Sequence, residues 1–244
     1  MKLTQLIKYN LFTKQLSELP TTGKYVINTI NPHSYCVAKK DVIFSNALKT
    51  SDVLLPDGIG IVLATKILTG KSIEKIAGAD VHHYLLKQAN KKKQKVCYLG
   101  ASEKTLQLIK ERIHKEYKNI RVTSYSPPFK EEFSKQDNLE MLKFINTFKP
   151  NILFVGLTAP KQEKWVYINK EAINANTIVS IGAVFDFYAG TVVRSSKFWI
   201  QIGLEWLPRL LREPKRLWKR NFISTPEFIL DVLKVKINEV NKNY

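Results

Sequence analysis

Between residue 24 and about residue 190, short apolar runs alternate with longer stretches of helical pattern. The runs predict strands at Tyr25–Thr29, Val53–Leu55, Val96–Leu99, Arg121–Ser124, Ile152–Val155 and Thr177–Ile181. Helical patterns lie near residues 33–49, 59–69, 79–93, 102–117, 135–148 and 160–174. Short buried strands joined by helices are typical of βαβ units. We therefore expect an α/β fold with a Rossmann-like, mainly parallel sheet and helices on both faces.

After Ser196 the pattern changes to successive helices rich in aromatic and basic residues. Apolar residues recur at helical spacing from Phe198 to Leu211, and Pro214 is expected to stop or kink that helix. The segment 209–220 contains one acid, Glu213, and six basic residues: Arg209, Arg212, Lys215, Arg216, Lys219 and Arg220. We expect a core of residues 1–195 and a basic, amphipathic helical appendage of residues 196–244. Its apolar face packs on the core, lies in the headgroup layer of an anionic membrane, or does both.

The formal net charge of +18 over 244 residues predicts a polyanionic partner. A phosphorylated substrate and an anionic membrane both fit, whereas no pattern of a nucleic-acid-binding fold is visible, so nucleic acid is not expected. Cys36 and Cys97 are far apart in apolar surroundings, which indicates buried thiols of a reducing compartment. No signal-peptide pattern occurs, and no run approaches the ~18–20 apolar residues of a membrane span. We expect a cytoplasmic protein.

In such a fold, ligands bind beyond the carboxyl ends of the strands. Polar or glycine residues follow four of the expected strands: Thr29 and Asn31, Asp57 and Gly58, Gly100, and Asp186. Asp57 lies at a turn between Pro56 and Gly58, where partial burial would raise its pKa toward that of a useful general base. The alternative is that Asp57 is an ordinary turn or capping residue.

The segment Asn151–Trp165 is the strongest single signal. Its strand runs into Gly156, and Pro160 then opens a helix whose first turn carries Lys161, Gln162 and Glu163. A helix start at a strand end presents backbone N–H groups to a phosphate-bearing ligand. An ordinary strand–turn–helix connection remains the alternative.

No motif for a covalent nucleophile or a bound metal is present. The chain contains no Asp-x-Asp, no GxSxG and no Walker P-loop. The four histidines show no metal-ligand spacing: His33, His82, His83 and His114. We therefore expect neither a metal nor a cofactor.

Several of these segments occur together and in order. They are T-x-N-P (Thr29–Pro32), L-P-D-G-x-G-I (Leu55–Ile61), A-G-A-D (Ala77–Asp80), Y-L-G-A (Tyr98–Ala101), G-L-x-A-P-K-Q-E-K-W (Gly156–Trp165), G-A-x-F-D-x-x-A-G-x-V-x-R (Gly182–Arg194) and G-L-E-W-L-x-R-L-x-x-E-P-x-R (Gly203–Arg216). This set resembles the WecG/TagA/CpsF glycosyltransferase family, over nearly the whole chain from about residue 24. Lys75 stands where family members often carry Arg.

The resemblance implies an inverting, metal-independent glycosyltransferase. Such enzymes move an N-acetylmannosamine-type or related sugar from a UDP-sugar to a polyprenyl-diphosphate-linked sugar, such as undecaprenyl-diphospho-GlcNAc. They act in the synthesis of teichoic acid or other bacterial surface polysaccharides. The resemblance also implies that the appendage binds the inner face of the plasma membrane and completes the site.

The resemblance also assigns roles to particular residues. It implies Asp57 as the catalytic base, with Thr29, Asn31 and Gln162 lining the pocket. It makes three arginines of the appendage candidates for the diphosphates: Arg209, Arg212 and Arg216. From their strand-end positions we add four further substrate-binding candidates: Gly58, Gly100, Lys161 and Asp186. The competing hypotheses are a non-catalytic nucleotide-binding protein and a nucleic-acid binder, and an oligomer is compatible with either class.

Overall fold

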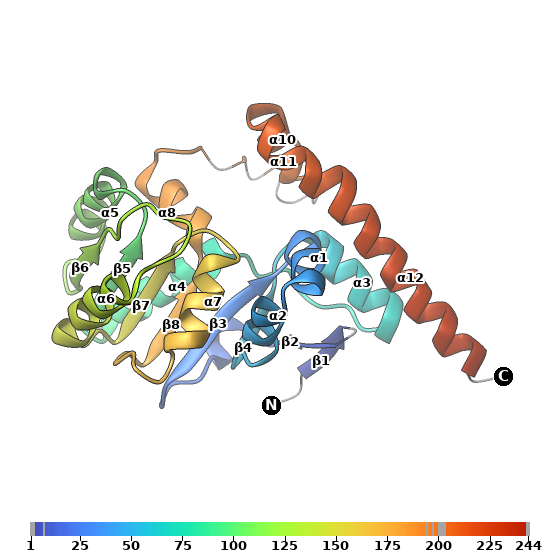
Figure 1. Cartoon of the computed structure of the whole chain (residues 1–244), viewed down its shortest axis with the longest axis horizontal. Helices are drawn as coiled ribbons and strands as arrows, with labels where there is room; N and C mark the ends of the chain where they lie inside the picture. Colours follow the sequence, from blue (N-terminus) through green and yellow to red (C-terminus); the bar gives the residue numbers. More distant parts are fainter. Residues whose placement is uncertain (1–2, 7, 194, 197, 200–203, 243–244) are drawn as a thin grey trace.

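The structure, a computed structural model, describes residues 3–6, 8–193, 195–196, 198–199 and 204–242. Its centre is a six-stranded parallel sheet in the order β4-β3-β8-β7-β5-β6 (Figure 1). The strands are β3 (Tyr25–Ile30), β4 (Val53–Pro56), β5 (Lys95–Gly100), β6 (Arg121–Tyr125), β7 (Ile152–Gly156) and β8 (Thr177–Ser180). All six predicted strands are therefore confirmed, and no strand end differs from its prediction by more than one residue.

Helices cover both faces of this sheet because alternate strand residues need apolar partners on either side. One face packs against α4 (Gly78–Lys91), α5 (Glu103–Glu116) and α8 (Gly182–Ala189). The other face packs against α2 (Val42–Lys49), α6 (Lys135–Phe148) and α7 (Lys161–Asn169). The expected α/β architecture is confirmed.

The helical pattern predicted near residues 33–49 is confirmed, but two helices occupy this stretch where the pattern suggested one. The first, α1 (Pro32–Lys40), ends before Asp41, and α2 begins after it. The Asp41 carboxylate accepts a hydrogen bond from the backbone N–H of Phe44 at 2.9 Å and so caps α2. A side chain that satisfies the orphan donors of a new helix allows the chain to turn at this point.

The first residues form elements that the sequence did not indicate. Strands β1 (Leu3–Leu6) and β2 (Tyr9–Phe12) pair as an antiparallel hairpin outside the main sheet, and a short 3₁₀ helix, η1 (Leu16–Glu18), follows. Tyr9, Leu11 and Phe12 are fully buried. The hairpin therefore extends the hydrophobic core beyond the β4 edge of the sheet.

The C-terminal region is helical. It comprises α10 (Trp206–Arg212), α11 (Pro214–Lys219), the π-helical turn η2 (Arg220–Ser224) and α12 (Thr225–Lys242). The predicted break is confirmed, because α10 ends before Pro214 and α11 begins at it. Part of the expected helix over 198–211 falls on residues 200–203, outside the described residues.

Helix α12 lies beside α1 and α3 (Ile59–Thr69), beyond the β4 edge (Figure 1). Its Phe228 and Val232 are buried in a cluster with Tyr35 and Ile61. The proposed division between residues 195 and 196 stays a prediction. In the described part of the chain, no helix combines the length and apolarity that crossing a membrane requires.

Candidate active site

The loops that follow β3 and β4 meet at the carboxyl edge of the sheet. The backbone N–H of Asp57 donates to the carbonyl of Ile30 at 2.9 Å. A Cβ on Gly60 would lie 2.7 Å from Cγ of Pro32, so only glycine permits this close approach. The structure thus brings the T-x-N-P and P-D-G-x-G segments together. Asp57 is half-buried there, directly before α3.

Asn31 holds the first of these loops. Its side-chain oxygen accepts from the backbone N–H of Ser34 at 3.0 Å, and its own N–H donates to the Ser34 hydroxyl at 2.8 Å. This reciprocal capping fixes the start of α1 beside Asp57. Thr29, half-buried, is the penultimate residue of β3.

The segment before α4 joins the same edge. The N–H of Ile76 donates to the carbonyl of Pro56 at 3.0 Å, next to Asp57. A Cβ on Gly78 would lie 3.0 Å from Ile181, the residue before α8. Residues 76–78 therefore connect the Asp57 loop with the start of α8.

Gly100 and Gly156 end the neighbouring strands β5 and β7. After β5 the chain continues to β6 on one side of this pair, and after β7 it continues to β8 on the other side. Such a switch point is where open α/β sheets bind ligands. Gly100 has a φ of +118°, and a Cβ there would lie 2.3 Å from the Gly156 carbonyl oxygen. Gly100 is therefore required for the two strand ends to lie this close.

Gln162 is buried and connects the starts of α7 and α8. Its side-chain oxygen accepts from the N–H of Gly182 at 3.1 Å, and its amide nitrogen donates to Glu163 at 2.9 Å. A Cβ on Gly182 would lie 2.7 Å from that oxygen, so the glycine admits the contact. The side chain thus ties the starts of α7 and α8 to one another. Direct contact between Gln162 and a substrate stays a prediction.

Glu163 is a buried carboxyl group to which the sequence analysis gave no role. Burial raises its pKa to about 7, against the smaller opposing effect of the Gln162 hydrogen bond. In the described chain, Oε2 of Glu163 and Oδ1 of Asn28 have no hydrogen-bond partner. Both residues line one small cavity of about 10 Å³, together with Val26 and Lys170. A cavity of this size holds about one water molecule.

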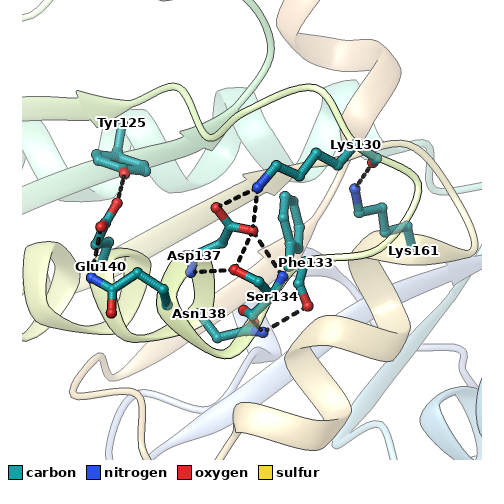
Figure 2. A network of polar contacts seen from close by, with 9 residues as sticks. Tyr125, Lys130, Phe133, Ser134, Asp137, Asn138, Glu140 and Lys161 are labelled. Atoms are coloured by element: carbon teal, nitrogen blue, oxygen red, sulfur yellow. Dashed lines mark hydrogen bonds and ion pairs between the residues drawn. The ribbon is translucent and has the colours of Figure 1, made fainter.

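Lys161 turns toward the loop between β6 and α6 (Figure 2). Its ammonium donates to the carbonyl of Lys130 and lies 3.6 Å from the centroid of the Phe133 ring. The Lys130 ammonium in turn pairs with Asp137 at 2.8 Å, beside the Ser134 cap of α6. A phosphate that binds Lys161 would therefore compete with this loop for the ammonium.

Asp186, in α8, is fixed by the turn that ends the helix. Its carbonyl accepts from the N–H groups of Thr191 and Val192, and its carboxylate lies 3.4 Å from the Thr191 hydroxyl. The side chain is half-buried. Its role in substrate binding stays a prediction.

The C-terminal region reaches this edge through Glu205. The Glu205 carboxylate pairs with Lys75 at 3.2 Å, next to Ile76, and its carbonyl accepts from the Ser195 hydroxyl at 2.8 Å. Arg212 donates to the carbonyl of Val193 at 2.9 Å. Arg209 and Arg216 belong to α10 and α11, but their side chains lie outside the described part of the structure.

Arg220 is a site candidate that sequence reasoning did not single out. His33, directly after the T-x-N-P segment, shares a 2.9 Å hydrogen bond with Ser224. Burial, and secondarily the charge of Arg220, lowers the pKa of His33. Arg220 belongs to η2, which contacts α1 close to the loop that carries Asn31. The basic cluster in the sequence contained this residue, but spacing alone could not tell which of its arginines would lie in this turn.

Among the described residues, no group of three or more His, Cys, Asp or Glu side chains is arranged to hold a metal ion. Cys36 and Cys97 are buried free thiols, as expected. His82 is buried and shares a 2.7 Å hydrogen bond with the Tyr98 hydroxyl.

The loops and helix starts gathered at one edge of the sheet define an α/β protein with its candidate ligand site at the carboxyl ends of parallel strands. The chain matches the glycosyl transferase WecG/TagA/CpsF family over residues 4–242, and it belongs to that family.

Three relatives carry the same name, N-acetylglucosaminyldiphosphoundecaprenol N-acetyl-beta-D-mannosaminyltransferase. The protein from Bacillus subtilis (strain 168) is 35% identical over 214 residues, which are 88% of this chain and 81% of the relative. The protein from Bacillus spizizenii is 32% identical over 229 residues, or 91% and 86% of the two chains. The protein from Staphylococcus aureus (strain MW2) is 25% identical over 216 residues, or 88% and 82%. The family resemblance is confirmed.

Proposed function

We propose that this protein transfers an N-acetylmannosamine-type sugar from a UDP-sugar to a polyprenyl-diphosphate-linked GlcNAc, in the synthesis of teichoic acid or a related surface polysaccharide. The names of the relatives support the sugar and the acceptor. The observation that carries the proposal is the position of Asp57, half-buried where the β3 and β4 loops meet.

In this mechanism Asp57 acts as the general base. Its carboxylate takes the proton from the acceptor hydroxyl while that oxygen attacks the anomeric carbon on the face opposite UDP. One displacement of this kind inverts the anomeric centre. A positioned general base contributes about 10²–10⁴-fold to a rate.

Negative charge then develops on the departing UDP. We propose that the N-terminal end of α7 meets this charge, together with arginines of the C-terminal region. Arg212 and Arg220 are the candidates whose contacts the described residues support, and Arg209 and Arg216 stay candidates from the sequence. Planar guanidinium groups suit this task because they bind phosphate oxygens in pairs. No metal is part of this proposal.

We propose that residues 196–244 hold the enzyme on the cytoplasmic face of the plasma membrane, where its lipid-linked acceptor resides. The Lys75–Glu205 ion pair supports a link between this region and the Asp57 loop, since Lys75 precedes Ile76. Docking of the region at a bilayer would then bring its arginines to the site only when lipid is present.

A UDP-release assay tests the proposal. Purified full-length protein is incubated with anionic phospholipid vesicles, a panel of UDP-sugars and a short-chain lipid-diphosphate-GlcNAc analogue, with and without EDTA. We expect turnover with UDP-N-acetylmannosamine that EDTA does not abolish. Binding of UDP without release from any donor would instead indicate a non-catalytic nucleotide-binding protein.

A further inference from the structure

Large apolar side chains are exposed along one side of α3. Ile59, Leu63 and Ile67 recur every four residues and are 42 to 52% exposed. The opposite side of the same helix buries Ile61 and Ala64. Helix α3 thus belongs to the core with one side and presents an apolar stripe with the other.

Helix α12 presents a second stripe of the same kind. Ile229, Leu233 and Ile237 also recur every four residues and are 44 to 58% exposed. Phe228 and Val232, on the side toward the core, are buried. Exposed leucine and isoleucine at this density on neighbouring helices exceed what single scattered surface residues explain.

The two stripes lie on helices that contact each other. The acidic flank of α12 faces α1, because Glu227 and Asp231 both pair with Lys39, at 2.9 and 2.6 Å. On a helical wheel, Ile229 and Leu233 lie on the flank opposite these two acids. Figure 1 shows α3 and α12 side by side, and the two helices are in contact.

We propose that the exposed stripes of α3 and α12 form one lipid-facing surface, with which the α/β core itself contacts an anionic bilayer. The α3–α12 surface comprises Ile59, Leu63, Ile67, Ile229, Leu233 and Ile237. Membrane contact is thereby assigned to a helix of the core as well as to the C-terminal region.

The positive charge near the α3–α12 surface favours an anionic bilayer over a second copy of the chain as the partner of this surface. Lys66 and Lys71 lie in and just after α3, and the segment 206–224 carries six basic residues and one acid. A symmetric dimer would bring two copies of these positively charged regions together, which like-charge repulsion disfavours. An anionic leaflet attracts them and receives the apolar stripes.

The surface also orients the candidate site, a consequence that rests on the proposed function. Helix α3 begins two residues after Asp57, so docking through α3 holds this carboxylate close to the bilayer surface. The diphosphate of a lipid-linked acceptor lies at that depth. The acceptor sugar would therefore reach Asp57 without leaving the membrane interface.

Vesicle flotation with the full-length protein tests the surface. The test variant is Leu63→Glu with Ile67→Glu, and the matched control is Val42→Glu with Ile43→Glu in α2, whose side chains are 74 and 44% exposed. With vesicles of phosphatidylcholine and phosphatidylglycerol, we expect the α3 variant to bind about tenfold more weakly and the control to bind like the wild type. Thermal melts identify any variant that fails to fold.

Equal vesicle binding by the α3 variant and the wild type would overturn the proposal. So would a wild-type dimer in gel filtration that the α3 variant dissolves, with no vesicle binding by either, since a second copy would then be the occupant. The flotation readout needs no turnover, so it stands even if the glycosyltransferase assay fails.

Discussion

At the scale of single residues, Gly100 is the position where a small substitution meets fixed backbone. Its φ of +118° disfavours any side chain, and an added Cβ would lie 2.3 Å from the Gly156 carbonyl. We expect Gly100→Ala to lower the free energy of unfolding by roughly 3 kcal/mol or more. Gly23→Ala is the control, because Gly23 has a φ of +81° but nothing within 4 Å of its added Cβ. Urea denaturation of both variants measures the loss of unfolding free energy from backbone strain alone at Gly23 and from strain together with the steric clash at Gly100. Equal losses in the two variants would contradict this explanation.

Asp57→Asn is the residue-scale test of the chemistry. The amide has nearly the same shape but cannot take the acceptor proton, so we expect kcat to fall about 10²–10⁴-fold. UDP affinity should change little, because the substitution removes a base and leaves the backbone N–H bond to Ile30 intact. Single-turnover kinetics and calorimetric UDP titration measure the two effects. An unchanged kcat would exclude Asp57 as the base.

Glu163 makes stability depend on pH in a defined direction. Its pKa is about 7 in the fold, against an ordinary value of 4.5. Between these pH values the native state keeps a proton that the unfolded chain releases, so the free energy of unfolding falls as pH rises. We expect Glu163→Gln to remove this decline, because its side chain does not titrate. Thermal melts of both proteins from pH 4 to pH 8 give the difference, and parallel curves would contradict the assignment.

At the scale of secondary-structure elements, the sheet could be predicted from sequence because its strands are buried on both faces. Ile152–Val155 and Thr177–Ser180 read as uninterrupted apolar or small segments, and no helical period competes with them. The break at Asp41 could not be predicted, because Val42 and Ile43 continue the apolar pattern although both are exposed. The capping bond that ends one helix and starts the next is visible only in three dimensions.

The candidate site divides in the same way. The positions of Asp57, Gly100 and Asn31 at strand ends followed from the order of elements alone. The directions of Lys161 and Gln162 did not, because they depend on how α7 rotates against its neighbours. Lys161 contacts the β6–α6 loop (Figure 2), and Gln162 contacts Gly182. Both contacts join residues that are far apart in the sequence.

Helix α12 gives an element-scale prediction. Phe228 is buried and packs edge-on against Tyr35, with ring centroids 5.1 Å apart. We expect Phe228→Ala to cost about 3–5 kcal/mol of packing and to loosen α12 from α1 and α3. Hydrogen exchange in α12 should then rise. Ile229→Ala is the control, because the neighbouring Ile229 is exposed, and it should leave the exchange unchanged. Equal exchange in both variants would mean that Phe228 does not anchor the helix.

At the scale of the whole molecule, the C-terminal region has two kinds of contact with the rest. Near the candidate site it is held by polar groups, chiefly Lys75–Glu205 and His33–Ser224. Farther along, α12 is held by buried apolar side chains and by Lys39. The gating proposed above requires the polar contacts to exchange for lipid or substrate phosphates while the apolar contacts keep the region attached.

Truncation after Ser196 tests this division of roles. The sheet and the helices on its two faces lie within residues 1–196, so we expect the shortened chain to fold. Its melting temperature should fall because loss of Phe228 and Val232 uncovers Tyr35 and Ile61. Turnover of the lipid-linked acceptor should be lost, because the arginines of the C-terminal region are removed together with the α12 stripe. Circular dichroism, thermal melts and UDP release measure the three outcomes. Full turnover by the truncated chain would place charge stabilisation entirely within the α/β core and would overturn the role given to the arginines.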